Sequence, residues 1–303
     1  MKTVRKNSGF WASLRWWSSP PPPPSPGDPL RIGLALGGGF ARGIAHVGVL
    51  RVFERYRIPV HCIAGVSAGS MVAAAYASGT SPDEIGNIGC SMRFADIARW
   101  SICRMGFAGS ERMEKFLQKL LKCFRFEKMR VPAGVLATDL STGEPVIFQR
   151  EGDVVLPIRA SCSYPGLFQP VQYGERLLVD GAMSMEVPAH LARALGANYV
   201  ISVQLPMQGP AMAPRNMFQV VNRCFQIMQR QTEQRWRKES DLTIVPDVHG
   251  IPWDGFSNGI QLIDAGEKAA MAALPEIERA LARTTSVQKR PAFTSAAPPF
   301  QAA

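Results

Sequence analysis

The sequence contains no run of 18 or more apolar residues, so it predicts no transmembrane helix. Its N-terminus is basic, but Arg15 interrupts the short apolar stretch 10–17, and no small-residue cleavage site follows. We therefore expect no signal peptide and a protein that stays in the cytoplasm. No internal repeat is visible either.

Metal-binding patterns are missing as well. The six cysteines are widely scattered, form no Cys-x-x-Cys pair and share no zinc-ligand spacing with the few histidines. Most of them have apolar neighbours, so we expect reduced packing residues and no metal site. These cysteines are Cys62, Cys90, Cys103, Cys123, Cys162 and Cys224.

The composition is that of a globular protein, because 46% of the 303 residues are hydrophobic and 19% are charged. Acidic residues are the scarcer charge: 24 of them face 34 basic ones, and the formal net charge is +10. This balance suggests an anionic partner, either a lipid surface or a nucleic acid. No stacking aromatics are grouped with base-reading residues as in a known nucleic-acid module, so we expect no nucleic acid partner.

Two low-complexity ends flank a single predicted domain. Residues 19–29 are almost all Pro, Ser, Gly and Asp, a composition that favours a semi-rigid polyproline II linker. We therefore predict a basic, aromatic tail with its linker over residues 1–30 and a folded domain over residues 31–283. Residues 284–303 are low in large apolar side chains and are predicted to form a flexible tail.

Within the domain, apolar runs of strand length alternate with segments of helical periodicity. A further helix is predicted to begin after Ser81, which is the N-cap, with Pro82 as its first residue and Glu84 as its third. Continuous apolar strands between helices argue for a buried, largely parallel sheet in a three-layer α/β/α sandwich. The predicted strands cover residues 32–36, 61–66, 134–138, 146–149, 177–179, 199–205 and 242–245, and the predicted helices cover 42–56, 68–78, 111–122, 188–195, 216–238 and 258–282.

Gly65-Val66-Ser67-Ala68-Gly69 is a Gly-x-Ser-x-Gly motif between a predicted buried strand and a predicted helix. The motif alone is weak, because chance produces it in many chains. In this context the two glycines permit the strained strand-to-helix turn that exposes a serine hydroxyl at a helix N-terminus. There the helix dipole favours developing negative charge. Ser67 is therefore a candidate nucleophile, and the alternative is a simple N-cap.

A second glycine-rich turn also joins a predicted strand to a predicted helix, and it reads Gly37-Gly38-Gly39-Phe40-Ala41-Arg42-Gly43. Its backbone N–H groups suit an anion, either a nucleotide phosphate or the oxyanion of a tetrahedral intermediate. The glycine spacing does not fit the dinucleotide fingerprint, no acidic residue ends the strand 61–66, and there is no P-loop lysine. An oxyanion hole needs only backbone donors, of which this loop can supply two or three.

A serine nucleophile needs a base, which is usually histidine. None of the four histidines follows in the position expected of an α/β-hydrolase triad; they are His46, His61, His190 and His249. Asp180 is the better candidate, because it ends an apolar strand and precedes Gly181. Ligands bind beyond the carboxyl ends of strands in open α/β sheets, where we expect this carboxylate. When such an aspartate is considered without its context, a residue that caps a turn is a more frequent explanation than a catalytic base.

Taken in this order and on these elements, the three motifs resemble the patatin-like phospholipase family, and the likeness covers nearly all of residues 31–282. The segment 158–170, IRASCSYPGLFQP, resembles the block that precedes the aspartate strand in that family. The sequence is similar to the bacterial branch and to the catalytic domain of neuropathy target esterases.

The resemblance implies two-step acyl transfer by a Ser-Asp dyad without histidine, metal or organic cofactor. Ser67 is then the nucleophile and Asp180 the base. The implied oxyanion hole consists of the amides of Gly38, Gly39, Phe40 and Ala41, and the implied supporting residues are Gly37, Arg42, Gly43, Gly65, Gly69 and Gly181. Phe40 departs from the pattern, since many members have glycine there. If the position needs a positive φ, phenylalanine is strained.

Basic and aromatic residues point to membrane contact in some segments. The first 18 residues combine four basic residues with a phenylalanine and three tryptophans, as an interfacial anchor does, although a tail without a role fits equally well. Residues 99–130 carry nine basic residues against three acidic ones, where this family places a variable cap. The apolar stripe of residues 216–238 keeps helical spacing, so we expect it to pack into the core.

The leading hypothesis is a lipid acyl hydrolase whose substrate is a phospholipid, a lysophospholipid or a related ester, with peripheral contact to an anionic membrane. A non-catalytic, membrane-associated regulatory protein that keeps the fold is the second hypothesis. The intact Ser67, Asp180 and glycine loop argue against it. A hydrolase of soluble acyl esters or thioesters is the third, which the basic surface disfavours.

Overall fold

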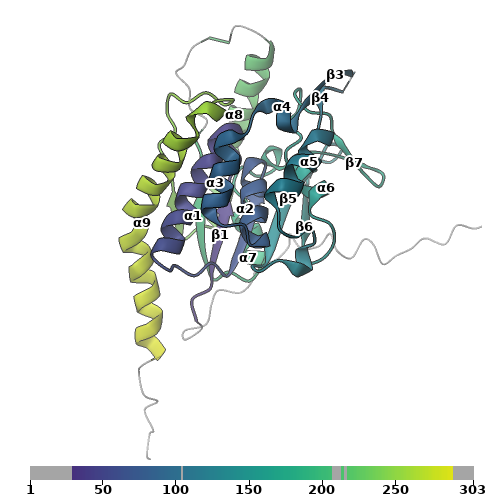
Figure 1. Ribbon diagram of the computed structural model, residues 1–303. Coiled ribbons are helices and arrows are strands. Elements are labelled where there is room, and N and C mark those ends of the chain that lie inside the picture. The colour runs from purple at the N-terminus through teal and green to yellow at the C-terminus, as the bar shows by residue number, and fades with distance from the viewer. Residues whose placement is uncertain (1–28, 104, 207–212, 215–216, 289–303) are drawn as a thin grey trace, which may run out of the picture.

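The computed structural model describes residues 29–103, 105–206, 213–214 and 217–288. The segment predicted to be an interfacial anchor and most of the predicted C-terminal tail lie outside the described residues. Within the described residues, helices cover both faces of one central sheet (Figure 1). The predicted α/β/α sandwich is therefore confirmed.

One sheet of eight strands forms the centre of the fold. Its order is β10 (Leu242–Ile244), β9 (Tyr199–Val203), β1 (Ile32–Leu36), β2 (Cys62–Val66), β5 (Ala133–Asp139), β8 (Arg176–Asp180) and β7 (Val171–Tyr173), with β6 (Pro145–Gln149) beside β5. The five strands from β10 to β5 are parallel, β6 and β8 run antiparallel to β5, and β7 runs antiparallel to β8. Both β1 and β2 are buried along their whole length, as strands covered on two faces are.

Helices form a layer on each face of the sheet. Figure 1 looks onto the face that is covered by α1 (Ala45–Arg55), α2 (Ala68–Ser78), α3 (Pro82–Ser91) and α9 (Gly259–Gln288). On the opposite face, α7 (Ala189–Ala194) and the fully buried Trp236 of α8 (Met217–Arg237) pack against β1 and β2. The predicted start of α3 is confirmed, because Ser81 and Glu84 form a reciprocal capping box.

Several short elements escaped the sequence analysis. They are α4 (Phe94–Ile97), the hairpin of β3 (Arg99–Cys103) and β4 (Gly106–Gly109), α6 (Val155–Ser161) and β7. The predicted helix α5 (Glu111–Leu120) is present. The helix expected from residue 42 begins instead as a 3-10 turn, Phe40–Ile44, before α1. At the other end of the chain, α9 continues to Gln288, past the predicted domain end at residue 283.

Helix α8 differs from the prediction that its apolar stripe packs into the core. Val221 and Phe225 are only half-buried, and Met228 is 46% exposed. The buried side chains of α8, Gln229 and Trp236, lie toward its C-terminal end. Its N-terminal part therefore rises from the body of the protein, as Figure 1 shows at the top of the molecule.

None of the helices in the part of the chain that the structure describes is both long and apolar enough to cross a membrane. The same residues contain no group of three or more His, Cys, Asp or Glu side chains arranged to hold a metal ion. The five cysteines with described side chains are free: Cys62, Cys90, Cys123, Cys162 and Cys224. Cys62 and Cys162 are buried, as packing residues are, whereas Cys224 is exposed, unlike the prediction.

Candidate active site

Ser67 occupies a strained turn between β2 and α2. Its φ of 52° and ψ of −129° lie outside the regions that non-glycine residues prefer. The turn is tight enough to exclude side chains at the flanking glycines. A Cβ at Gly65 would collide with the backbone of Gly69, and a Cβ at Gly69 would collide with the carbonyl of Leu36. These contacts explain why the motif needs glycine on both sides of the serine.

The position of Asp180 follows from the way three strands share β5. Because β6 pairs with one edge of β5 along 134–138, β2 and β8 must occupy the other edge. There β2 pairs with 133–136 and β8 with 137–139, so the two strands run toward each other and meet. Val66 is opposite Leu136 and Asp180 is opposite Ala137, which brings the residue after Val66 beside Asp180.

This arrangement corrects the reason given for Asp180 from the sequence. We expected the carboxylate at the carboxyl edge of a parallel sheet, but β8 is antiparallel to β5. Asp180 reaches the site because β8 ends where β2 ends, coming from the opposite direction.

Ser67 and Asp180 form a buried hydrogen bond. The Ser67 hydroxyl donates to Asp180 Oδ2 at 2.7 Å, and the Ala182 N–H donates to Asp180 Oδ1 at 2.9 Å. Ser67 is 7% exposed and Asp180 is 1% exposed. Burial raises the pKa of the Asp180 carboxyl to about 7, although both hydrogen bonds act to lower it. A carboxyl with this pKa can accept and return a proton near neutral pH.

Two further serines hold the backbone of Ser67, and the sequence analysis missed both. The Ser161 hydroxyl accepts from the Ser67 N–H at 2.8 Å and donates to the Leu136 carbonyl at 2.6 Å. The Ser70 hydroxyl donates to the Ser67 carbonyl at 2.6 Å. Ser161 lies within the block 158–170 that resembles the family, which was the available signal for its role.

The glycine loop lies against Ser67, but not all of its amides face the site. A Cβ at Gly38 would lie 3.3 Å from Ser67 Cβ. The N–H of Gly38 donates to the carbonyl of Glu186 at 3.3 Å, and that of Ala41 donates to the carbonyl of Trp253 at 3.0 Å. Among the described residues, no backbone hydrogen bond partner is found for the N–H groups of Gly39 and Phe40.

Phe40 has the positive φ that the sequence analysis considered, with a value of 51°. This backbone strain coincides with close packing of the ring, which lies 4.9 Å from the ring of Tyr164 and 5.1 Å from that of Trp253 in edge-on contacts. Arg42 fixes the end of the loop, because its Nε donates to the carbonyl of Ile251 at 2.9 Å. The aromatic packing thus holds a phenylalanine where glycine would be unstrained.

Three of the four histidines have described partners other than Ser67 and Asp180. His46 Nε2 lies 2.8 Å from the Gly37 carbonyl, so this nitrogen carries the proton and supports the glycine loop. Burial lowers the pKa of His46 to about 4, which keeps the ring neutral. His61 Nδ1 accepts from the Ile32 N–H, and His249 pairs with Asp247. None of these three histidines is bonded to Ser67 or Asp180, which are bonded to each other.

The model of the family described as patatin-like phospholipase matches residues 34–193, which is more than half of the chain. This chain belongs to that family. The matched region contains the glycine loop, Ser67 and Asp180.

Individual relatives of this patatin-like protein are distant. An uncharacterized NTE family protein of Mycobacterium tuberculosis is 33% identical over 187 residues, which are 61% of this chain and 51% of the relative. The lysophospholipase NTE1 of Mycosarcoma maydis is 26% identical over 229 residues, which are 73% of this chain and 12% of that one. The chain spans about half the length of the mycobacterial relatives it matches. Among solved structures, VipD from Legionella pneumophila has a TM-score of 0.49 and 13% identity, over 82% of this chain and 68% of VipD.

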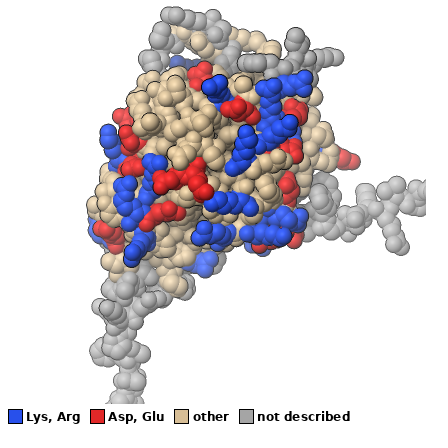
Figure 2. Space-filling view, viewed as in Figure 1, with Lys and Arg blue, Asp and Glu red and all other residues tan. Residues whose placement is uncertain are grey.

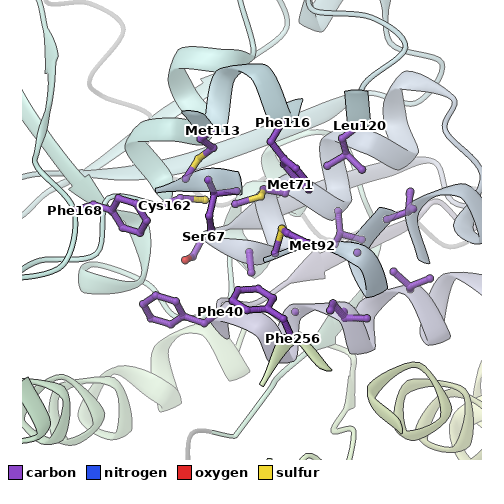
Figure 3. Close-up of a pocket in the computed structure, with 18 residues that line it drawn as sticks. Phe40, Ser67, Met71, Met92, Met113, Phe116, Leu120, Cys162, Phe168 and Phe256 are labelled. Carbon is purple, nitrogen blue, oxygen red and sulfur yellow. The ribbon is translucent and has the colours of Figure 1, made fainter. Parts of the chain in front are cut away.

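In this member of the patatin-like phospholipase family, Ser67 borders an apolar cavity of about 70 Å³. Figure 3 shows Ser67 with Phe40 and Phe256 on one side and Met113, Phe116 and Leu120 on the other. Apart from Ser67, the side chains that line the cavity are apolar or a thiol. The hydroxyl of Ser67 is thus placed where an apolar group and a reacting carbonyl could meet it.

Proposed function

We propose that this chain is a serine acyl hydrolase of lipid esters, of the phospholipase A or lysophospholipase type. The observation that carries the proposal is the 2.7 Å hydrogen bond between Ser67 and Asp180 at the edge of an apolar cavity. Membership of the patatin-like phospholipase family supports the same class of reaction. Ser67 acts as the nucleophile and Asp180 as the base.

The proposed reaction has two halves. Asp180 takes the proton from the Ser67 hydroxyl while Ser67 Oγ attacks the ester carbonyl carbon, which forms a tetrahedral oxyanion. Collapse of this intermediate breaks the ester C–O bond, and the leaving alcohol receives the proton from Asp180. Water then attacks the acyl carbonyl carbon as Asp180 accepts its proton. The bond between the acyl carbon and Ser67 Oγ breaks, Asp180 returns the proton to Ser67 Oγ, and the fatty acid is released.

The oxyanion requires donors that are ready before the reaction. The amides of Gly39 and Phe40 meet this requirement best, because they have no backbone acceptor among the described residues. The amides of Gly38 and Ala41 already donate to carbonyl groups. Of these two, Gly38 has the longer bond, at 3.3 Å, and lies beside Ser67, so it can supply a third donor by turning away from Glu186.

The apolar cavity favours a substrate with a hydrocarbon chain. Met71, Met92 and Met113 line it, and the flexible, polarisable methionine side chain adapts to chains of different shape. The net charge of +10 favours substrates at an anionic surface. Both features support a lipid substrate over a small soluble ester.

A length-selective variant tests the role of the cavity. Gly89 lines it, and a Cβ there would meet only Ile44, at 3.5 Å, so a larger side chain would extend into the cavity without backbone strain. We expect Gly89→Leu to lower kcat/KM for a long-chain ester by about tenfold, the effect of roughly 1.4 kcal/mol. The measurement compares p-nitrophenyl palmitate with p-nitrophenyl acetate, whose turnover should change little. Equal losses on both esters would contradict an acyl-chain site.

The pKa of Asp180 sets a pH dependence. As the base, Asp180 must be ionised, and burial raises its pKa to about 7. We expect kcat/KM for a short-chain ester to rise with pH through about 7 and then level off. Glu186 is a second buried carboxyl whose pKa burial raises to about 7, so Glu186→Gln is the control. The midpoint should persist in that variant; its disappearance would assign the titration to Glu186.

The same shift predicts a stability difference that does not depend on turnover. The raised pKa means that folded Asp180 holds its proton between its ordinary pKa of 3.8 and about 7, so stability is lost as the pH rises through this window. Asp180→Asn removes the buried charge. Its melting temperature should therefore exceed that of the wild type above pH 7, with no such advantage below the window.

Hydrolysis of a panel of acyl compounds tests the proposal directly. The panel contains a short-chain ester, a lysophospholipid, a diacyl phospholipid and an acyl thioester, with Ser67→Ala protein as the blank. We expect release of fatty acid from the lipid esters by the wild type alone. Preferred turnover of the thioester would support a hydrolase of soluble acyl compounds, and no turnover above the blank would support a non-catalytic protein.

A further inference from the structure

The N-terminal part of α8 exposes apolar side chains that the fold does not use. Met217 is 72% exposed, Val220 is 48%, Ile227 is 49% and Met228 is 46% exposed. On the inner side of the same helix, Asn222 and Phe225 make contact with the body of the protein. The helix therefore has one face that packs and one apolar face that lies open to solvent.

The β3–β4 hairpin presents a second group of this kind. Met105 at its turn is 56% exposed, and Phe107 on β4 is 54% exposed. Figure 1 shows that the hairpin and α8 both project at the upper end of the molecule, where the strands β1, β2 and β5 end. Two separate projections thus carry exposed apolar side chains at the end of the sheet that holds Ser67.

One short segment joins both projections to the active site. The Tyr164 hydroxyl donates to Asn222 Oδ1 of α8 at 2.8 Å, and its ring lies 5.2 Å from Phe225. Three residues further on, the Leu167 carbonyl accepts from the N–H groups of β4, at 2.9 Å for Ala108 and 3.1 Å for Phe107. Between them runs the segment 164–168, whose last residue, Phe168, lines the cavity beside Ser67.

The charge around the projections favours an anionic partner. Residues 93–109 contain Arg93, Arg99 and Arg104 against Asp96 alone, and residues 217–230 contain Arg223 and Arg230 with no acidic residue. Arg93, Arg99 and Arg230 are exposed. On the face seen in Figure 2, basic side chains lie at the hairpin end as well as along the left side and the lower edge, with acidic ones among them. A surface of this kind combines apolar insertion with electrostatic attraction.

We propose that the exposed apolar residues of α8 and the β3–β4 hairpin form a docking surface for an anionic phospholipid bilayer. The docking surface consists of Met105, Phe107, Met217, Val220, Ile227 and Met228. It rests on the proposed function, because a bilayer on this surface faces the cavity of Ser67. The segment 164–168 connects this surface to the cavity, because its last residue, Phe168, lines the cavity beside Ser67. Phe40 packs against Tyr164 and carries one of the proposed oxyanion donors. Binding of the bilayer next to Tyr164 therefore also affects the position of Phe40.

Co-sedimentation with vesicles tests the docking surface in the full-length chain. We expect the double variant Phe107→Ser, Val220→Ser to bind vesicles of phosphatidylcholine with added phosphatidylglycerol at least about tenfold more weakly than the wild type, because two partly inserted apolar side chains are lost. The matched control is Tyr56→Ser, Met271→Ser. These residues are 43% and 38% exposed, and lie at the end of α1 and within α9. The control variant should bind these vesicles as the wild type does. Both of these proteins should bind more weakly to vesicles of phosphatidylcholine alone.

Separate readouts distinguish this proposal from the proposed function. Ser67→Ala should bind vesicles like the wild type, and the double variant should keep its turnover of a soluble short-chain ester while losing turnover of phospholipid in vesicles. If the wild type cleaves no ester but binding depends on Phe107 and Val220, the docking surface stands and the proposed function fails. Unchanged vesicle binding in the double variant overturns the docking surface. A loss of self-association on gel filtration with unchanged vesicle binding also overturns it, and assigns the surface to contact between copies.

Discussion

Ser67→Ala and Asp180→Asn are each expected to lower kcat/KM for a short-chain ester by roughly a thousandfold or more, because a nucleophile and its base fail together when either is removed. Ser67 has Asp180 as its hydroxyl partner at 2.7 Å, and the histidines with described partners are bonded elsewhere. Among the described residues, Asp180 is the only base in a described hydrogen bond with the Ser67 hydroxyl. Steady-state kinetics on purified variants, with circular dichroism to confirm folding, give the measurement.

Asp139→Asn is the matched control for the aspartate. Asp139 is also buried in the sheet, 4% exposed, but it accepts from the Ser141 N–H and pairs with Arg176 at 3.6 Å. This variant should lose stability and keep its turnover per folded molecule. Substantial activity in Asp180→Asn, together with its loss in a histidine variant, would show that the base is a histidine.

Gly38→Val is expected to lower kcat by about a hundredfold or more, the usual effect of disturbing an oxyanion hole. A Cβ at Gly38 would already lie 3.3 Å from Ser67 Cβ and 4.0 Å from Ser67 Oγ. The larger valine side chain would therefore push the loop away from Ser67 and occupy the space in front of the Gly39 amide. Because the loss falls on the transition state, KM should change much less than kcat.

The control for this variant is a glycine whose Cβ would be equally crowded but would not touch Ser67. A Cβ at Gly86 would lie 3.3 Å from Ile263 and Val47, in the packing of α3 against α9 and α1. Gly86→Val should retain nearly full turnover per folded molecule, because the added side chain meets Ile263 and Val47 and not Ser67. If Gly38→Val is as active as Gly86→Val, the loop does not hold the oxyanion.

The parts of the site that could be predicted depend on local backbone geometry. Gly65 is needed because a Cβ there would collide with Gly69 and Ser70 in the same turn, and such a local requirement is visible in the motif itself. Gly69 is needed for a different reason, because a Cβ there would collide with the carbonyl groups of Leu36 and Gly37 in the glycine loop. The backbone strain at Phe40 could also be predicted, because a residue that replaces glycine keeps the positive φ of that position.

The parts that could not be predicted depend on contacts between distant residues. The sequence places Asp180 at the end of a strand, but its antiparallel approach along β5 is a matter of register between residues 137 and 180. The carbonyl groups of Glu186 and Trp253 accept hydrogen bonds from two of the loop amides. No sequence pattern near residue 38 reveals these two partners, and so none reveals which amides remain available. Ser161 supports Ser67 across a separation of 94 residues.

Helix α8 shows a different limit. Helical periodicity indicates that a helix has an apolar face, but it does not tell whether that face is covered. The inner contacts of α8 through Asn222 and Phe225 use residues adjacent to the exposed Val220 and Ile227. Only the three-dimensional arrangement separates the two faces.

The most direct test of the central claim is to locate the covalent adduct formed with an alkyl fluorophosphonate. Its phosphoryl oxygen imitates the oxyanion, so it reacts with a serine only where nucleophile, base and oxyanion donors act together. We predict a single stoichiometric adduct on Ser67 by peptide mass mapping, strongly reduced in Gly38→Val and in Asp180→Asn. An adduct on another residue, or labelling of Ser67 that is unchanged in Asp180→Asn, would contradict a serine hydrolase built on Ser67 and Asp180.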